Sequence, residues 1–200
     1  MNYLAHALLA GPAITDRVGG LAGDFVKGLL PGTLPPGLAA GVALHRAIDQ
    51  WADSHPAFRA SRARVSPARR RYAGILVDVF YDHLLAVHWD HYHAMPLARF
   101  TRQLYEEAAL HVGELPSRFA QVLPLMQSDD WLAAYREPAA VGFVLDGMSR
   151  RHVRQPNPLA GALAELERNY AGFEADFLSF MPAAIDFAER RLITRVTCGQ

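Results

Sequence analysis

The segment from Gly74 to Val87 constrains the fold of this chain more than any other. Its residues are apolar on nearly every side, as expected of a helix that its neighbours bury all round. The same segment nevertheless contains Asp78, Asp82 and His83. Because Asp78 and Asp82 are four residues apart, they share a helix face and place two carboxylates in a low-dielectric environment. An unpaired charge there is costly, so a proton, an arginine or a metal cation must compensate.

Helical periodicity dominates the rest of the chain, and the alternating Val, Ile and Thr runs of strands are absent. A chain of 200 residues is short enough for one domain. We therefore predict an all-α fold, a single compact helical domain over residues 1–200. Pro182 is expected to kink or split the last helix. Helices are predicted at residues 37–53, 67–90, 97–111, 117–127, 138–150 and 158–192.

Residues 37–53 repeat the pattern of a buried helix with polar residues on its apolar side. His45 and Asp49 fall on the apolar stripe, four residues apart. Such a pair can present nitrogen and oxygen ligands to one divalent ion, and the adjacent Arg46 could contact a phosphate oxygen. A His–Asp contact that only locks the helix is the alternative interpretation.

Two further polar residues lie in apolar surroundings nearer the start of the chain. Asp24 follows Gly23 in a glycine-rich apolar stretch, where Gly19, Gly20 and Gly23 allow close backbone approach. Lys27 is close enough to Asp24 for an ordinary salt bridge. His6 lies in the apolar run NYLAHALLA, where a hydrogen-bonded core histidine is the simpler interpretation.

Three separate helical segments thus bring imidazole or carboxylate groups to apolar faces of one small domain. We expect the shared core to force these groups together into a metal site. Oxygen-rich ligands mixed with imidazole favour Mn²⁺ most, with Mg²⁺ or Fe also suitable, over a structural zinc site. His88, His91 and His93 could also bind metal, although a helix end packed with Trp and Tyr is the simpler interpretation.

Composition excludes several classes of protein. The formal net charge of zero gives no general basis for binding nucleic acid. No window approaches the ~20 apolar residues of a membrane span, and the N-terminus lacks the basic region of a signal peptide. Cys198 is the only cysteine, which predicts a reducing compartment and therefore a cytoplasmic location. The local signatures of acyl hydrolases, P-loop proteins, dinucleotide-binding proteins and zincins are absent.

All basic residues except Lys27 are arginines, which grip phosphate or carboxylate with a planar fork. High genomic GC content would produce the same bias, so their clustering is more informative. Arg69, Arg70 and Arg71 precede the acids of residues 74–87 by roughly 10–20 Å along a helix. A basic patch there would steer an acidic protein substrate, whereas a solvated start to a helix is the alternative. The arginine clusters comprise Arg59, Arg62, Arg64, Arg69, Arg70 and Arg71, and later Arg150, Arg151 and Arg154.

Four motifs in order resemble the acyl carrier protein phosphodiesterase family: N-Y-L-A-H at the start, G-D-F-V-K-G at 23–28, L-H-R-A-I-D-x-x-x-D-S-H-P at 44–56 and V-D-V-F-Y-D-H-L-L-A-x-H-W at 77–89. Members of that family look like outlying relatives of the HD-domain phosphohydrolases, so the resemblance implies an HD-domain-like fold. It also implies hydrolysis of the phosphodiester that joins 4′-phosphopantetheine to a serine of holo-acyl carrier protein. The expected partner is the acidic carrier protein, and neither nucleic acid nor membrane is expected.

The resemblance also suggests roles for the polar residues. Asp82-His83 reverses the usual His-Asp order of HD proteins, which leaves the ligand set open. Asp78 could also act as general base or position water. Metal binding is assigned to Asp24, His45, Asp82 and His83, ligation or support of the imidazoles to Asp49 and Asp78, and phosphate charge stabilisation or leaving-group protonation to His6, Lys27 and Arg46.

Two other functions fit the same residues. One is an HD-type, metal-dependent phosphohydrolase that acts on nucleotides or another small phosphoester. The other is a non-catalytic helical protein that binds carrier protein and holds its acids in salt bridges.

Overall fold

A computed structural model describes residues 1–151 and 157–198. Within that part the chain forms eleven α-helices and four short 3-10 helices and no strand, which confirms the all-α prediction. Arg154, and the side chains of Arg151 and Cys198, lie outside the described residues. The α-helices are α1 (Tyr3–Leu9), α2 (Ile14–Ala22), α3 (Pro36–Ser54), α4 (Pro56–Arg64), α5 (Ala73–Val87), α6 (Leu97–Leu110), α7 (Ser117–Ser128), α8 (Trp131–Ala134), α9 (Pro138–Arg151), α10 (Leu163–Arg168) and α11 (Tyr170–Cys198). The 3-10 helices are η1 (Gly23–Phe25), η2 (Pro67–Tyr72), η3 (Trp89–His91) and η4 (Val112–Glu114).

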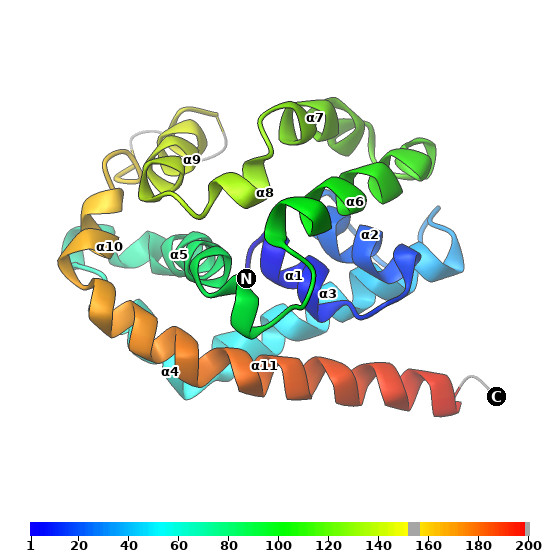
Figure 1. Cartoon of the computed structure of the whole chain (residues 1–200), viewed down its shortest axis with the longest axis horizontal. Helices are drawn as coiled ribbons and strands as arrows, with labels where there is room; N and C mark the ends of the chain where they lie inside the picture. The colour runs from blue at the N-terminus through cyan, green and yellow to red at the C-terminus, as the bar shows by residue number, and fades with distance from the viewer. Residues whose placement is uncertain (152–156, 199–200) are drawn as a thin grey trace.

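The helices are arranged around α1 and α5 (Figure 1). The long helix α11 runs along one side of the molecule and packs on α1, α3, α4 and α5. On the other side α6 packs on α2, α7 and α8, and α9 packs on α5 and α10. None of the described helices combines the length and apolar composition needed to cross a bilayer.

Helix α5 is buried on nearly all sides, as its sequence predicts. Phe80 and Tyr81 are at most 1% exposed. Tyr81 packs edge-on against Phe58 of α4, with ring centroids 5.6 Å apart, and against Phe177 of α11 at 5.5 Å. Each such aromatic side chain contributes roughly 1.5–3 kcal/mol by leaving water. The polar residues of α5 are therefore held rigidly.

Glycines allow α2 and α3 to approach until their backbones touch. A Cβ atom on Gly19 would lie 2.8 Å from the Cα of Gly41, and a Cβ on Gly41 would lie 2.7 Å from the carbonyl oxygen of Asp16. Larger residues would push the helices apart. This close packing brings the face of α3 that carries His45 against the end of α2.

Two predicted boundaries were wrong for identifiable reasons. Residues 67–72 form a 3-10 turn before α5, since Arg69 turns away to donate hydrogen bonds to Glu165 and to the carbonyl of Pro158. The predicted helix 158–192 breaks near Asn169, and α11 instead continues through Pro182, whose side chain is exposed. A proline on the solvent side leaves the unbonded carbonyl facing water.

Helix α4 was missed because its start was interpreted only as the end of the preceding helix. The side chain of His55 accepts a hydrogen bond from the backbone N–H of Ala57, and Pro56 occupies the first turn. Both are helix-start signals. His55 thus lies at the end of α3 and also caps the start of α4.

Candidate metal centre

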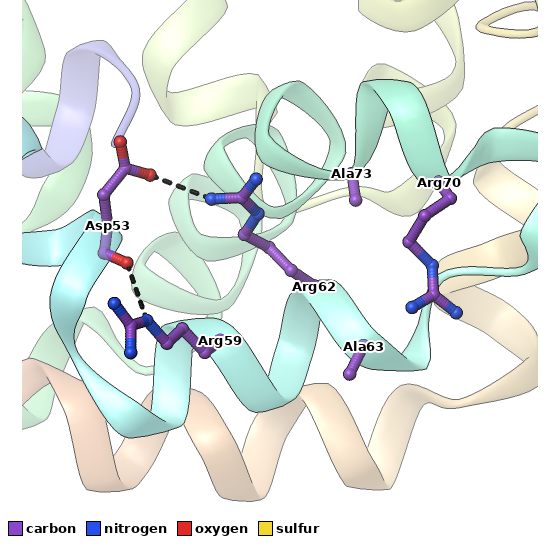
Figure 2. Close-up of a pocket in the computed structure, with 6 residues that line it drawn as sticks. All are labelled: Asp53, Arg59, Arg62, Ala63, Arg70 and Ala73. Carbon is purple, nitrogen blue, oxygen red and sulfur yellow. Dashed lines mark hydrogen bonds and ion pairs between the residues drawn. The ribbon is translucent and has the colours of Figure 1, made fainter.

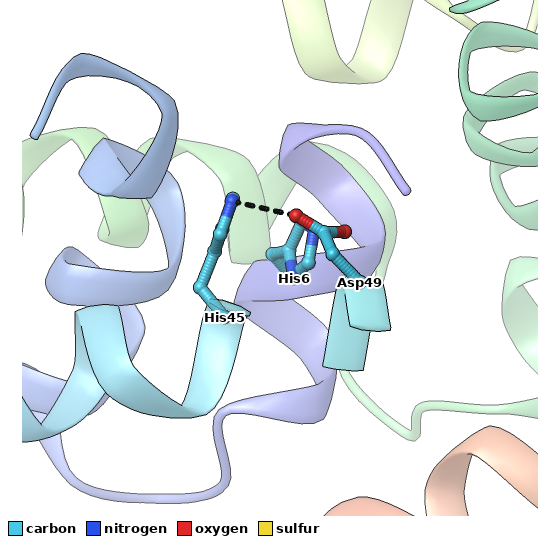
Figure 3. A group of neighbouring side chains, drawn as sticks. All are labelled: His6, His45 and Asp49. Atoms are coloured by element: carbon cyan, nitrogen blue, oxygen red, sulfur yellow. Dashed lines mark hydrogen bonds and ion pairs between the residues drawn. The ribbon is translucent and has the colours of Figure 1, made fainter. Parts of the chain in front are cut away.

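Three side chains from two helices meet where α1 faces α3. His6 projects from α1, and His45 and Asp49 project from consecutive turns of α3 (Figure 3). One ligand atom of each lies within 4.8 Å of the others. The Nε2 atom of His6 is 3.0 Å from Asp49 Oδ1, and the Nε2 atom of His45 is 3.2 Å from Asp49 Oδ2. Asp49 therefore bridges the Nε2 atoms of the two imidazoles, with one carboxylate oxygen on each.

The orientation of His45 is fixed by the segment that follows α2. Its Nδ1 donates to the carbonyl oxygen of Gly20 at 2.9 Å, which leaves Nε2 as the nitrogen that faces the carboxylates. Asp24 Oδ1 is 3.5 Å from that Nε2 atom. Gly23 lies flush against the ring, because a Cβ there would come within 2.4 Å of it. Asp24 thus joins the cluster, and the glycine beside it makes room for the imidazole.

Asp82 fixes the helix that carries His6. Its two carboxylate oxygens accept hydrogen bonds from the backbone N–H groups of Leu4, at 2.9 Å, and Ala5, at 3.1 Å. These N–H groups belong to the first turn of α1, where no helical partner exists. Burial raises the pKa of Asp82 to about 7, although both hydrogen bonds favour the charged form. The carboxylate therefore closes the N-terminal turn of α1 from another helix.

The amino group of Met1 connects the cluster to α5. It lies 2.9 Å from Asp49 Oδ1 and 2.9 Å from Asp78 Oδ1. Burial alone would lower the pKa of this amine, but the two carboxylates outweigh burial and raise the pKa to about 11. Asp78 has a raised pKa because it is buried, against the opposing pull of the Met1 charge.

The two histidines have opposite protonation preferences. Their rings stack with centroids 3.6 Å apart, so both cannot readily be charged. Burial and the neighbouring His45 lower the pKa of His6 to about 4. Burial would lower the pKa of His45 as well, but hydrogen bonds to Asp24 and Asp49 raise it to about 9. At neutral pH His45 carries the proton and His6 is neutral.

The carboxyl groups of Asp24 and Asp49 in turn are held ionised. Burial would raise the pKa values of Asp24 and Asp49, but the hydrogen bond from His45 outweighs it and lowers both. Around His6 and His45, the carboxylates of Asp24, Asp49 and Asp78 thus outnumber the cations.

This donor set fits a divalent cation. It combines imidazole nitrogens with carboxylate oxygens and contains no sulfur, as sites for Mn²⁺, Mg²⁺ or Fe do. The Nδ1 atom of His6 is buried and has no hydrogen-bond partner among the described residues. An unpaired buried nitrogen costs free energy. Separately, three carboxylates beside two cations leave negative charge that a divalent cation would offset.

Other predicted site residues have different partners. His83 was predicted as a metal ligand with Asp82. Its Nδ1 atom lies 2.7 Å from the carbonyl oxygen of Tyr135, and its Nε2 atom lies 3.2 Å from the hydroxyl oxygen of Tyr170. Neither His83 nor Asp82 belongs to the one group of potential ligands found in the described part of the chain. Their metal binding remains a prediction, which these contacts do not favour.

Arg46 and Lys27 lie beside the cluster. Arg46 donates to the carbonyl oxygens of Val26 and Gly28, at 3.0 and 2.9 Å, and so holds the loop that follows Asp24. Lys27 is exposed in that loop. Sequence reasoning missed the role of the Met1 amine, for which no side-chain pattern gives a signal. It also missed the carbonyl of Gly20, although the glycines before Asp24 did indicate a close approach.

The fold and the cluster define an all-helical protein with a partly buried group of nitrogen and oxygen ligands. Comparison with known proteins gives the family. The acyl carrier protein phosphodiesterase profile matches residues 1–184, and the chain belongs to this family. Relatives named acyl carrier protein phosphodiesterase include those of Serratia proteamaculans, 38% identical over 94% of this chain and 98% of theirs, and Yersinia pestis, 34% identical over 96% and 100%. No solved structure matches the chain.

Proposed function

We propose that this protein hydrolyses the phosphodiester between 4′-phosphopantetheine and a serine of holo-acyl carrier protein. The products are apo-acyl carrier protein and 4′-phosphopantetheine. The observation that carries the proposal is that the motifs shared with the family supply the cluster. His6 comes from the first motif, Asp24 from the second, and His45 and Asp49 from the third.

We assign the cation to His6, His45 and Asp49, with Asp24 as a further ligand. Mn²⁺ is the preferred ion, with Mg²⁺ or Fe as alternatives. Such a cation lowers the pKa of bound water and offsets negative charge on phosphoryl oxygens. The protein's own groups prepare the site: Gly20 orients His45, and Asp82 holds α1 and with it His6.

Side chains of the protein supply the other two functions that the reaction requires, proton transfer and stabilisation of negative charge. Asp78 is tied to the Met1 amine beside Asp49, where it can accept a proton from an attacking water. Lys27 is exposed next to Asp24 and can stabilise the phosphoryl oxygens or the departing serine oxygen. Arg46 acts by holding the loop that carries Lys27.

Mass spectrometry of holo-acyl carrier protein tests the proposal directly. Incubation with the enzyme and Mn²⁺, Mg²⁺ or Fe²⁺ should remove the mass of 4′-phosphopantetheine, and a chelator should stop the reaction. His45→Ala serves as the inactive control. Retention of the prosthetic group under all metal conditions, together with hydrolysis of a nucleotide in a parallel panel, would replace this function by a small-molecule phosphohydrolase.

A further inference from the structure

A basic pocket lies one helical turn along α3 from the candidate metal centre. It has a volume of about 430 Å³ and is lined by Asp53, Arg59, Arg62, Ala63, Arg70 and Ala73 (Figure 2). These residues come from the end of α3, from α4 and from the start of α5. We call it the arginine pocket.

Two of the residues that line the pocket lie close in sequence to residues of the cluster, one on α3 and one on α5. Asp53 is one turn beyond Asp49 on the same face of α3, a rise of about 6 Å, and Ala73 precedes Asp78 on α5 by about 7–8 Å. A phosphodiester held at the cluster would therefore have this pocket at one of its two ends.

Three guanidiniums and one carboxylate line this pocket. Arg62 pairs with Asp53 Oδ1 at 3.1 Å, and Arg59 donates to the backbone oxygen of Asp53 at 3.2 Å. Arg70 donates through Nε to the carbonyl of Val65 at 3.1 Å and lies beyond the small side chains of the pocket. The side chains of Arg62 and Asp53 remain 43% and 69% exposed. Positive charge is thus in excess and accessible.

The other arginines of this region serve the fold. Arg69 bonds to Glu165 and to the carbonyls of Pro158 and Ala160. Arg64 forms an ion pair with Asp176 at 2.7 Å. Of the basic patch predicted at residues 69–71, Arg70 lines the pocket, whereas Arg69 is bonded elsewhere.

We infer that the arginine pocket receives carboxylate side chains that flank the modified serine of the carrier protein. The inference rests on the proposed function. Beyond its phosphate, 4′-phosphopantetheine contains only amides, a hydroxyl and a thiol, which are uncharged at neutral pH. Guanidinium forks match carboxylates, whereas they gain little from a neutral arm. The pocket therefore sets the direction of the phosphodiester, with the carrier protein over α4 and the prosthetic arm on the opposite side.

Asp53 occupies the place of an incoming carboxylate in the free enzyme. An acid from the carrier protein would replace it as the partner of Arg62. Arginine removal and Asp53 removal should therefore have opposite effects on binding, whereas a merely structural ion pair would make both changes harmful.

Binding of apo-acyl carrier protein tests this without requiring turnover. Isothermal titration of the double variant Arg59→Gln/Arg62→Gln with apo-acyl carrier protein should show about 10-fold weaker binding than the wild type, and its affinity should depend less on salt. Asp53→Asn should tighten binding by about 2-fold or more. Binding of free 4′-phosphopantetheine should be unchanged in both. Arg99→Gln/Arg102→Gln on α6 removes the same charge from an exposed face and is the matched control.

Each contrary outcome has a defined meaning. Equal weakening by the α6 variant would show an effect of net charge alone, and weaker binding of 4′-phosphopantetheine would show that the pocket holds phosphate. Weaker carrier binding by Asp53→Asn would show a structural pair. Any of these overturns the inference. Unchanged carrier binding with normal release of 4′-phosphopantetheine would overturn it while the proposed function stands, and absence of release in the wild type would overturn the function itself.

Discussion

Carboxylates of α3 and α5 meet two different needs in this protein. Asp82 on α5 is fully buried, and both its oxygens bind backbone N–H groups of α1. Asp49 on α3 instead faces two imidazoles and an amine, groups that are themselves titratable. Both acids lie four residues from another polar group on an apolar helix. Spacing therefore does not separate a carboxylate that holds the fold from one suited to a ligand, whereas the partner of each oxygen does, and so does exposure, since the Asp49 side chain is 39% exposed.

The largest expected effect is at the α3 cluster. His45→Ala or Asp49→Asn should lower kcat/KM for holo-acyl carrier protein by at least about 100-fold, since changes outside the ligand shell alone cost about 10–100-fold. Mn²⁺ binding, followed by isothermal titration, should be lost with activity. His83→Gln is the comparison on α5 and should keep Mn²⁺ binding. Activity in Asp49→Asn without bound metal would refute the assignment.

A second test disturbs the cluster without touching a ligand. Gly23→Ala places a methyl group 2.4 Å from the His45 ring, so the imidazole must move. We expect a loss of roughly 10–100-fold in kcat/KM with weaker Mn²⁺ binding. Gly74→Ala is the control, because a Cβ there meets no atom within 4 Å. Full activity of Gly23→Ala would show that the position of His45 is not critical.

The α3 cluster and Asp82 also show how far the sequence could predict the site. The periodicity of α3 placed His45 and Asp49 correctly on one buried face, and the glycines before Asp24 indicated a close approach. The periodicity of α5 brought Asp78 and Asp82 to one face and the family resemblance suggested metal binding for Asp82, but neither can show that the first turn of α1 lies against α5. Pairing of a carboxylate with backbone of a distant segment depends on tertiary structure, and side-chain patterns contain no signal for it.

The helices show the same limit. Long apolar stripes predicted both ends of α3, α6, α7 and α9 to within two residues, because burial along one face determines where these helices run. The short helix α4 was missed because only Phe58 and Ser61 of its nine residues are buried. Asn169 interrupts the last predicted helix, whereas Pro182 does not, and the exposure of Pro182 could be known only from the packing of α11.

A third test addresses α5. Asp82→Ala leaves the N–H groups of Leu4 and Ala5 without acceptors, and should lower the free energy of unfolding by about 1–3 kcal/mol. Urea denaturation measures this loss. Mn²⁺ titration of the folded Asp82→Ala variant should show a much smaller loss of affinity than titration of His45→Ala. A variant that unfolds like the wild type but no longer binds Mn²⁺ would make Asp82 a ligand instead.

The pH dependence of stability gives Asp82 an independent signature. Burial raises its pKa from 3.8 to about 7, so between these values the folded state binds more protons than the unfolded state. The contribution of Asp82 to stability must then decrease as pH rises from about 4 to about 7. Denaturation of wild type and Asp82→Asn across this range should show the difference between them changing in that direction. A difference that stays constant would indicate an unshifted carboxylate.

The smallest expected effect separates a loop-holding arginine from a phosphate-binding one. Arg46→Met removes two hydrogen bonds to the carbonyls of Val26 and Gly28, which should cost less than about 1 kcal/mol because the side chain is partly exposed. The loosened loop contains Lys27, the only lysine of the chain, so a lysine-specific protease should cleave the variant faster there. Arg136→Met, which removes a similar bond to the carbonyl of Ala86, should leave that rate unchanged. If Arg46→Met instead raises KM while cleavage keeps its wild-type rate, Arg46 contacts the substrate, and the loop is held by the fold around it.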